Sequence, residues 1–202
     1  MNPKIKICGI TKKEEIPVLN EFNIDYVGFV FAKSKREVSV KDSMNLRANL
    51  NNNIKTVAVV KEPPIELLEE ILQGGFDILQ WHGSLKEETI KHINMPIWQA
   101  ISVKDKESLG NIIYDEKIIG YVFDGSAPGS GKPFDWQVLS DIQINSELIL
   151  AGGLDSDNII EAINKIKPTI VDVSSGVESD KGKDPYKIKE FVRKVKNYGN
   201  EQ

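Results

Sequence analysis

The sequence predicts an α/β fold in which eight parallel strands and their connecting helices close into a compact (β/α)8 barrel, the TIM barrel architecture. Short apolar runs rich in β-branched residues alternate with amphipathic stretches along the whole chain, and there are eight such runs. Each return between strands passes through a helix, so the strands run parallel, and eight parallel strands close naturally. Neither a low-complexity linker nor a break in composition divides the chain, so we expect one domain over residues 1–202.

The predicted strands lie at regular intervals, and each is bounded by polar or turn-forming residues. They cover residues 4–8, 25–31, 55–60, 77–81, 96–101, 118–123, 147–151 and 169–173. An open doubly wound sheet is the alternative, because the chain is shorter than most barrels. The dinucleotide-binding form of that sheet has a Gly-rich turn after its first strand, whereas Cys8-Gly9-Ile10-Thr11 follows here. The barrel is therefore favoured, with some helices brief or absent.

The predicted helices begin at capping signals. These signals are a side-chain oxygen at the N-cap with an acid three residues later, a lone Asp, or a proline in the first turn. The predicted starts are Thr11 with Glu14, Ser39 with Asp42, Pro63-Pro64, Ser84 with Glu87, Ser102 with Asp105, Phe134-Asp135-Trp136, Asp155 before 156–166, and Asp184-Pro185.

Composition excludes several classes of function. A net charge of -4 and a pI near 5.4, with Lys and Arg scattered among the acids, provide no basic face, so nucleic acid is not an expected partner. The single cysteine excludes an internal disulfide. The chain begins without an apolar leader and contains no run long enough to span a bilayer, so we expect a cytoplasmic protein.

Strand ends are where a barrel carries its chemistry, because catalytic groups lie at the carboxyl ends of the strands. In the first run, alternation turns Ile5 and Ile7 toward the helices and leaves Lys6 and Cys8 facing the lumen, about 7 Å apart. A nearby ammonium favours the thiolate. A lone free cysteine is more often a small buried hydrophobe, so Cys8 becomes a candidate only together with later features.

The sixth run ends in Asp124, at the position that matches Cys8. A lone Asp there is ordinarily a turn or cap residue. The Gly-rich segment 125–132 follows it directly, and its glycines suit a loop that folds over a ligand as a lid. The segment lacks the glycine spacing of a P-loop.

Two further loops are candidates for phosphate binding. Residues 151–154 follow the seventh run and residues 174–178 follow the eighth. Backbone N–H groups exposed by glycine, beside a hydroxyl, suit a dianion, and barrels commonly bind phosphate at these last two loops. Two tight turns are the alternative interpretation. The predicted phosphate-binding residues are Gly152, Gly153, Ser175 and Gly176.

The chain as a whole resembles the phosphoribosylanthranilate isomerase family. Seven motifs in register carry the resemblance: Lys6-Ile7-Cys8-Gly9-Ile10-Thr11, Val27-Gly28-Phe29-Val30-Phe31, Lys33-Ser34-Lys35-Arg36, Gln80-Trp81-His82-Gly83, Gly129-Ser130-Gly131-Lys132, Phe134-Asp135-Trp136, and Val171-Asp172-Val173-Ser174-Ser175-Gly176-Val177-Glu178. The resemblance implies the (β/α)8 barrel and an Amadori rearrangement in L-tryptophan biosynthesis. N-(5-phosphoribosyl)anthranilate would become 1-(2-carboxyphenylamino)-1-deoxy-D-ribulose 5-phosphate, without cofactor or metal.

The resemblance also implies roles for individual residues. Asp124 would be the general acid and Cys8 the general base, which requires a carboxyl kept protonated by burial and a thiol ionised by Lys6 or another cation. Arg36 would bind the anthranilate carboxylate, although without the family it would be a solvated charge. His82 would contact the substrate or be structural. Asp172 would lie near the sugar hydroxyls, pair with Lys6 as a buried ion pair, or do both.

Two alternative functions remain open on the sequence. One is the related sugar isomerase of the histidine pathway, against which Cys8 counts, because that enzyme uses an Asp there. The other is a non-catalytic barrel that binds a phosphorylated ligand. The chain departs from the usual family residues at Ala32, Trp81, Ser84 and Pro133, none of which is a proposed catalytic group. The expected partner is a small phosphorylated substrate, and the sequence leaves monomer and homodimer open.

Overall fold

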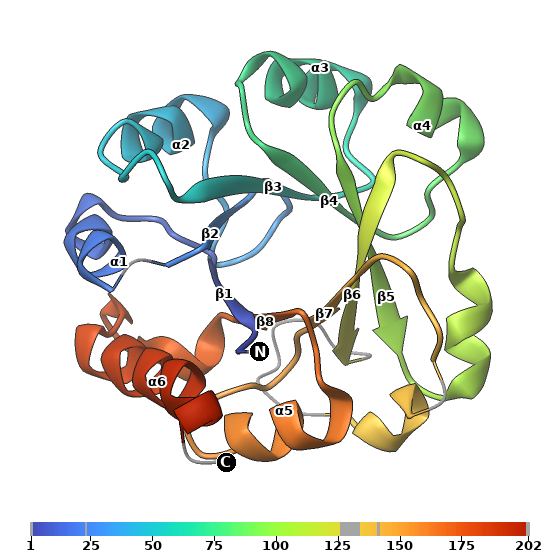
Figure 1. Cartoon of the computed structure of the whole chain (residues 1–202). Helices are drawn as coiled ribbons and strands as arrows, with labels where there is room; N and C mark the ends of the chain where they lie inside the picture. Colours follow the sequence, from blue (N-terminus) through green and yellow to red (C-terminus); the bar gives the residue numbers. More distant parts are fainter. Residues whose placement is uncertain (1, 23, 126–133, 141, 201–202) are drawn as a thin grey trace.

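In the computed structural model, which describes residues 2–22, 24–125, 134–140 and 142–200, eight parallel strands form a closed barrel in chain order (Figure 1). The last strand pairs with the first, so the open doubly wound sheet is excluded. Every predicted strand boundary falls within two residues of the observed one. The strands are Lys4–Cys8 (β1), Tyr26–Val30 (β2), Lys55–Lys61 (β3), Ile78–His82 (β4), Ile97–Val103 (β5), Ile118–Gly125 (β6), Glu147–Leu150 (β7) and Ile170–Val173 (β8).

Helices surround the barrel on the outside, as Figure 1 shows. The α-helices are Ile16–Glu21 (α1), Val40–Arg47 (α2), Ile65–Gln73 (α3), Glu87–His92 (α4), Ile159–Ile166 (α5) and Pro185–Asn197 (α6). The 3-10 helices are Lys13–Glu15 (η1), Lys106–Asn111 (η2), Trp136–Leu139 (η3), Ser175–Val177 (η4) and Tyr198–Asn200 (η5). In the described parts of the connections after β5 and β6, 3-10 turns replace an α-helix. Such short connections let a chain of this length close a barrel.

Three predicted helix starts are confirmed by their hydrogen bonds or by their proline. The Ser39 hydroxyl accepts from the Asp42 backbone N–H at 3.0 Å, as an N-cap should. Asp184 caps α6 through the backbone N–H groups of Tyr186 and Lys187. Pro64 is the N-cap of α3, directly after Pro63. Local side-chain chemistry was sufficient to place these starts.

Other predicted caps are wrong or displaced. Ser84 caps nothing at α4, which begins after Lys86, and Ser102 lies inside β5, leaving Asp105 as the cap of η2. After β1 the acid that bonds the loop is Glu15, whose carboxylate accepts from the Thr11 and Lys12 backbone N–H groups.

One later helix begins further along the chain than predicted, and another begins where it was predicted but is only a short 3-10 helix. The Asp155 carboxylate accepts from the backbone N–H groups of Asp157 and Asn158 in the turn before α5. That helix therefore begins three residues after the predicted position 156. Asp135 does cap a helix, but it is the short 3-10 helix η3. Residues 156–158 form a tight turn, which the capping pattern does not distinguish from a first helical turn.

Two apolar layers make up the core. Ile5 and Ile7 pack in the outer layer between strands and helices, as predicted. The lower lumen is filled mainly by aliphatic side chains together with Tyr26 and Trp98, whose rings meet edge to face at 5.0 Å. Gly120 makes room for the indole, since a Cβ there would lie 2.9 Å from it. The lumen is therefore a packed core below the layer that carries the polar groups. Within the described residues, no helix has the length and apolarity needed to cross a membrane.

Candidate active site

A buried ion pair lies in the lumen between the first and last strands. The Lys6 ammonium donates to the Asp172 carboxylate at 2.6 Å, and their side chains are 0% and 6% exposed. The register of β1 against β8 places these residues directly opposite each other. The predicted pairing of Lys6 with Asp172 is therefore confirmed, and it connects the two strands that close the barrel.

Cys8 is the last residue of β1 and lies two residues after Lys6, so both side chains are on the same face of the strand. Its neighbour across the sheet is Gly28, and a Cβ at that position would lie 2.7 Å from the Cys8 Sγ. Burial raises the pKa of the Cys8 thiol, whereas the positive charges of Lys6 and Lys183 act to lower it. The net shift is upward, so the expected depression of the thiol pKa is absent from this structure. Desolvation of a nearly enclosed thiol outweighs the two cations.

Asp124 at the end of β6 is shifted in the direction that a general acid needs. Burial raises its pKa to about 6, and the negative charge of Asp172 adds to the effect. The loop after β7 packs against this carboxyl. Gly152 has a φ of +82°, and a Cβ there would lie 2.5 Å from the Asp124 Oδ1. Only glycine suits both the left-handed backbone and the close approach.

His82 ends β4 and lies beside Gln80, whose side-chain nitrogen is 2.9 Å from the His82 Nε2. Burial lowers the pKa of His82 to about 4, and the charges of Lys6 and Lys61 add to this, so the imidazole is neutral at physiological pH. Within the described residues, the buried Gln80 Oε1 and Asp172 Oδ1 lack a hydrogen-bond partner. Unpartnered buried acceptors of this kind are suited to a polar ligand.

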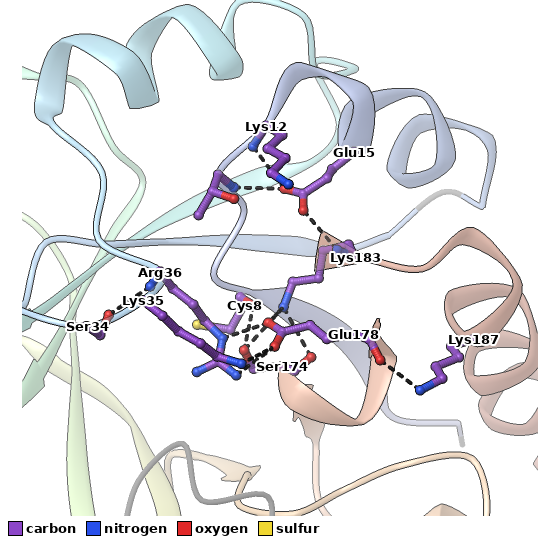
Figure 2. A network of polar contacts seen from close by, with 11 residues as sticks. Cys8, Lys12, Glu15, Ser34, Lys35, Arg36, Ser174, Glu178, Lys183 and Lys187 are labelled. Carbon is purple, nitrogen blue, oxygen red and sulfur yellow. Dashed lines mark hydrogen bonds and ion pairs between the residues drawn. The ribbon is translucent and has the colours of Figure 1, made fainter. Parts of the chain in front are cut away.

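Arg36 is held at the barrel mouth by Glu178, as Figure 2 shows. Its Nε and Nη2 donate to the two carboxylate oxygens of Glu178 at 2.6 and 2.9 Å. The Arg36 side chain is 12% exposed, so its interpretation as a solvated charge is wrong. Gly9, with a φ of +81°, lies under the arginine stem, and a Cβ at Gly9 would collide with it.

Glu178 gathers several cations in addition to Arg36. Lys183 contacts it at 2.7 Å and the exposed Lys35 at 3.2 Å. Although burial opposes it, hydrogen bonding to Arg36 and Lys183 lowers the pKa of Glu178 to about 2. This carboxylate is ionised under all physiological conditions.

The two predicted phosphate loops pack against each other. Gly152 and Gly153 form a left-handed turn after β7, and the Asn158 amide donates to the Gly153 carbonyl at 2.7 Å. Ser175 and Gly176 open η4 directly after β8. A Cβ on Gly176 would collide with the Leu154 carbonyl of the neighbouring loop. The four predicted phosphate-binding residues therefore lie at two adjoining loops, and their role stays a prediction. Most of the predicted lid, residues 126–132, lies outside the described residues.

Sequence reasoning missed two residues of the charged group around Arg36. Glu178 was part of a recognised motif without a role, and Lys183 was not singled out. Both belong to a short hairpin, Glu178–Ser179 (β9) and Gly182–Lys183 (β10), whose two-residue strands are too short to show any periodicity. No pattern in the sequence indicates that such a hairpin turns Lys183 inward.

The fold and site define a (β/α)8-barrel enzyme with an acid and a thiol at the carboxyl ends of its strands, beside cations suited to an anionic substrate. The family model for N-(5'-phosphoribosyl)anthranilate (PRA) isomerase matches residues 5–194. Curated relatives named N-(5'-phosphoribosyl)anthranilate isomerase include one from Thermoanaerobacter sp. (strain X514), 44% identical over 96% of this chain and 98% of the relative. One from Clostridium kluyveri is 43% identical over the same shares.

Solved structures agree with the sequence relatives. Phosphoribosyl anthranilate isomerase from Thermotoga maritima is 31% identical, with a TM-score of 0.87 over 96% of this chain and 99% of that one. A second structure of such an isomerase, in complex with reduced 1-(o-carboxyphenylamino)-1-deoxyribulose 5-phosphate, is 29% identical, with a TM-score of 0.83 over the same shares. The chain belongs to the N-(5'-phosphoribosyl)anthranilate isomerase family. It is an aldose-ketose isomerase of tryptophan biosynthesis, as the seven motifs implied.

Proposed function

We propose that Asp124 is the general acid and Cys8 the general base of the isomerisation. The observation that supports this most directly is the position of both groups around one buried ion pair. The charges of Lys6 and Asp172 act on the pKa of Cys8 and also on that of Asp124. The thiol and the carboxyl come from strands β1 and β6, and both lie within reach of the charges of the same ion pair.

The proposed chemistry needs one proton donor and one acceptor. Asp124 donates its proton to the ribose ring oxygen while the bond from that oxygen to C1′ breaks, and the anilino nitrogen lone pair forms an iminium. The Cys8 thiolate then removes the proton from C2′, and the C–H electron pair forms an enolamine that tautomerises to the ketose. Burial of Asp124 keeps a fraction of it protonated near neutral pH, which the first step requires.

The remaining substrate groups match the other residues of the site. Arg36 would bind the anthranilate carboxylate with its Nη1 edge, since its Nε and Nη2 already bond Glu178. His82 and Asp172 would bind the sugar hydroxyls, for which the unpartnered Asp172 Oδ1 is one acceptor.

The phosphate would lie at the opposite end of the substrate from the carboxylate. Gly152, Gly153, Ser175 and Gly176 would hold it with backbone N–H groups and a hydroxyl. The ligand named for the solved relative has both a carboxylate and a phosphate, which supports two anionic subsites in this chain.

The wider setting follows from the same assignment. We infer that residues 1–202 act as one barrel domain in the cytoplasm on this small-molecule substrate, without nucleic acid, membrane or cofactor, as monomer or homodimer. The net charge of -4 supports the absence of a nucleic-acid partner.

The experiment that tests the proposal follows the loss of anthranilate fluorescence when freshly generated phosphoribosylanthranilate is mixed with the protein. We expect rapid loss with the wild type and a fall of at least about 100-fold in kcat for Cys8→Ser and for Asp124→Asn, because each removes a proton-transfer group. His92→Gln, at an exposed position on α4, is the control and should keep full activity. Near-normal turnover by either site variant would refute its assigned role.

A further inference from the structure

A second buried ammonium lies at the site, beyond the one that pairs with Asp172. The Lys183 side chain is 1% exposed, and its Nζ donates to the Glu178 Oε1 at 2.7 Å and to the Ser174 carbonyl and hydroxyl at 3.1 and 3.2 Å. Its backbone N–H donates to Glu15 at 2.9 Å, which ties the hairpin to the loop after β1. Burying an ammonium costs free energy, so this position calls for an explanation.

Hydrogen bonds connect Lys183 to the end of β1. The Ser174 hydroxyl, which accepts from Lys183, donates to the Cys8 carbonyl at 2.9 Å. Figure 2 shows Lys183 extending from its hairpin toward Cys8, with Glu178 and Ser174 beside its amino group. The charge of Lys183 acts to lower the pKa of Cys8. Burial lowers the pKa of Lys183, and the carboxylate of Glu178 and the charge of Cys8 act against that shift. The arrangement therefore places a positive charge close to the only thiol of the chain.

Counting the charges around Glu178 shows that the positive charge of Lys183 is not fully neutralised. Glu178 is a single carboxylate that contacts two largely buried cations, Arg36 and Lys183. The third cation on it, Lys35, is 72% exposed and largely screened by solvent. Lys6 is balanced by Asp172. One positive charge is therefore left over at the mouth of the barrel, where a thiolate or a substrate carboxylate would compensate it.

We propose that Lys183 is a positioning residue whose ammonium, held by Glu178 and Ser174, stabilises the thiolate form of Cys8. This extends the proposed function, because it rests on Cys8 acting as the base. The charged groups that act on Cys8 are Lys6 from β1, Asp172 from β8, Lys183 from β10 and Arg36 from the segment after β2. Of these, Lys183 is the one that the hairpin brings to the site.

The test measures the ionisation of Cys8 directly in the free protein. Because the chain has one cysteine, labelling with cysteine carrying carbon-13 at Cβ gives a single NMR signal whose shift with pH reports its pKa. We expect Lys183→Met to raise the Cys8 pKa relative to the wild type. Glu178→Gln should lower it, because the amide oxygen can still accept from Lys183 while the neutralising charge is gone. Lys181→Met, an exposed change on the same hairpin, should leave it unchanged.

Opposite shifts in the two site variants would support the proposal, because a general loosening of the site would move both in the same direction. The proposal would be overturned if the Cys8 pKa were the same in Lys183→Met as in Lys181→Met. It would also be overturned if Lys183→Met and Glu178→Gln shifted the Cys8 pKa in the same direction. If Lys183→Met does not fold, Glu178→Gln decides alone: a downward shift supports the proposal, and no shift or an upward one refutes it.

The kinetic consequence is measured separately from the titration. We expect kcat/KM of Lys183→Met to fall about ten-fold at neutral pH, since less thiolate is present. The titration measures the Cys8 pKa without turnover, so it tests the effect of Lys183 on Cys8 even if another group is the base. Failure of the proposed function would show instead as full activity in Cys8→Ser.

Discussion

Asp124 and Glu178 are carboxyl groups at the same barrel mouth with opposite surroundings. Asp124 is half-buried, and its desolvation together with the negative charge of Asp172 raises its pKa to about 6. Glu178 is also partly buried, but the hydrogen bonds from Arg36 and Lys183 outweigh burial and lower its pKa to about 2. The contrast separates an acid that can hold a proton from an anion that fixes cations.

The pH dependence of kcat/KM follows from the two proposed catalytic groups. The active form has Cys8 as thiolate and Asp124 protonated, although the pKa of Asp124 is about 6 and that of Cys8 is raised by burial above its ordinary value. Between these values each unit of pH increases the thiolate ten-fold and decreases the protonated carboxyl ten-fold, so their product is constant. Below about pH 6 the thiolate keeps falling while the carboxyl is already protonated, and activity declines.

We therefore predict a broad plateau of kcat/KM that begins at about pH 6 and extends up to the raised pKa of Cys8, with the acidic limb set by Asp124. Initial rates at low substrate concentration across this range test the prediction. A narrow bell with both limbs near pH 7 would contradict it. Viscosity-independent rates should be confirmed first, so that proton transfer and not diffusion limits the measurement.

At the scale of the element, helix ends show where sequence patterns succeed and where they fail. Ser39 and Asp184 were identified correctly because an N-cap is a local interaction between a side chain and the next backbone N–H groups. Ser102 shows the same pattern but lies in β5, whose pairing with β6 continues through Val103. Tertiary strand pairing overrides a local cap, and no pattern within one segment reveals it.

The end of α5 shows a local strain that sequence patterns also did not indicate. Lys167 is the C-cap and has φ 52° and ψ 50°, a left-handed conformation that costs energy for a residue with a Cβ. We predict that Lys167→Gly raises the free energy of unfolding by about 0.5–1 kcal/mol, the relief of strain exceeding the greater freedom of glycine in the unfolded chain. Urea denaturation measures it.

The matched control for this prediction is Lys165→Gly, two residues earlier and inside the right-handed part of α5. It should lower the free energy of unfolding by about 1 kcal/mol, because glycine is a poor residue in a helix interior. Equal effects of the two substitutions would show that the cap conformation has no energetic role.

For the whole molecule, the barrel was predictable and the site was partly so. Regular alternation over the full chain gave eight strands, and strand ends gave Cys8, Asp124 and Asp172. Each of these has a position fixed by its own strand. Lys183 could not be found in this way, because its inward direction depends on a contact with Glu178 inside the hairpin and on Glu15, which bonds the hairpin from a distant part of the chain.

The buried pair of Lys6 and Asp172 lies at the seam between β1 and β8, where the barrel closes. We predict that Lys6→Met destabilises the fold by about 3–5 kcal/mol, because it leaves Asp172 as an uncompensated buried carboxylate. Lys6→Met combined with Asp172→Leu should recover most of this loss, since an apolar pair in the lumen needs no desolvation of charge.

A double-mutant cycle of unfolding free energies in urea, including Asp172→Leu alone, measures the coupling between the two side chains. If the double variant is no more stable than Lys6→Met, the cost lies in packing and the ion pair contributes no coupling. The cycle concerns stability alone, so loss of activity in these variants does not affect it.

The hydrogen bond from the Ser174 hydroxyl to the Cys8 carbonyl spans 166 residues of sequence, and this separation has a consequence during synthesis of the chain. During synthesis the thiol leaves the ribosome among the first residues, yet Asp172, Ser174 and Lys183 follow only near the end. An unfinished or prematurely terminated chain therefore carries the Cys8 thiol without its surroundings. We expect such fragments to be inactive toward the substrate, because Asp172, Ser174 and Lys183 are not yet in place.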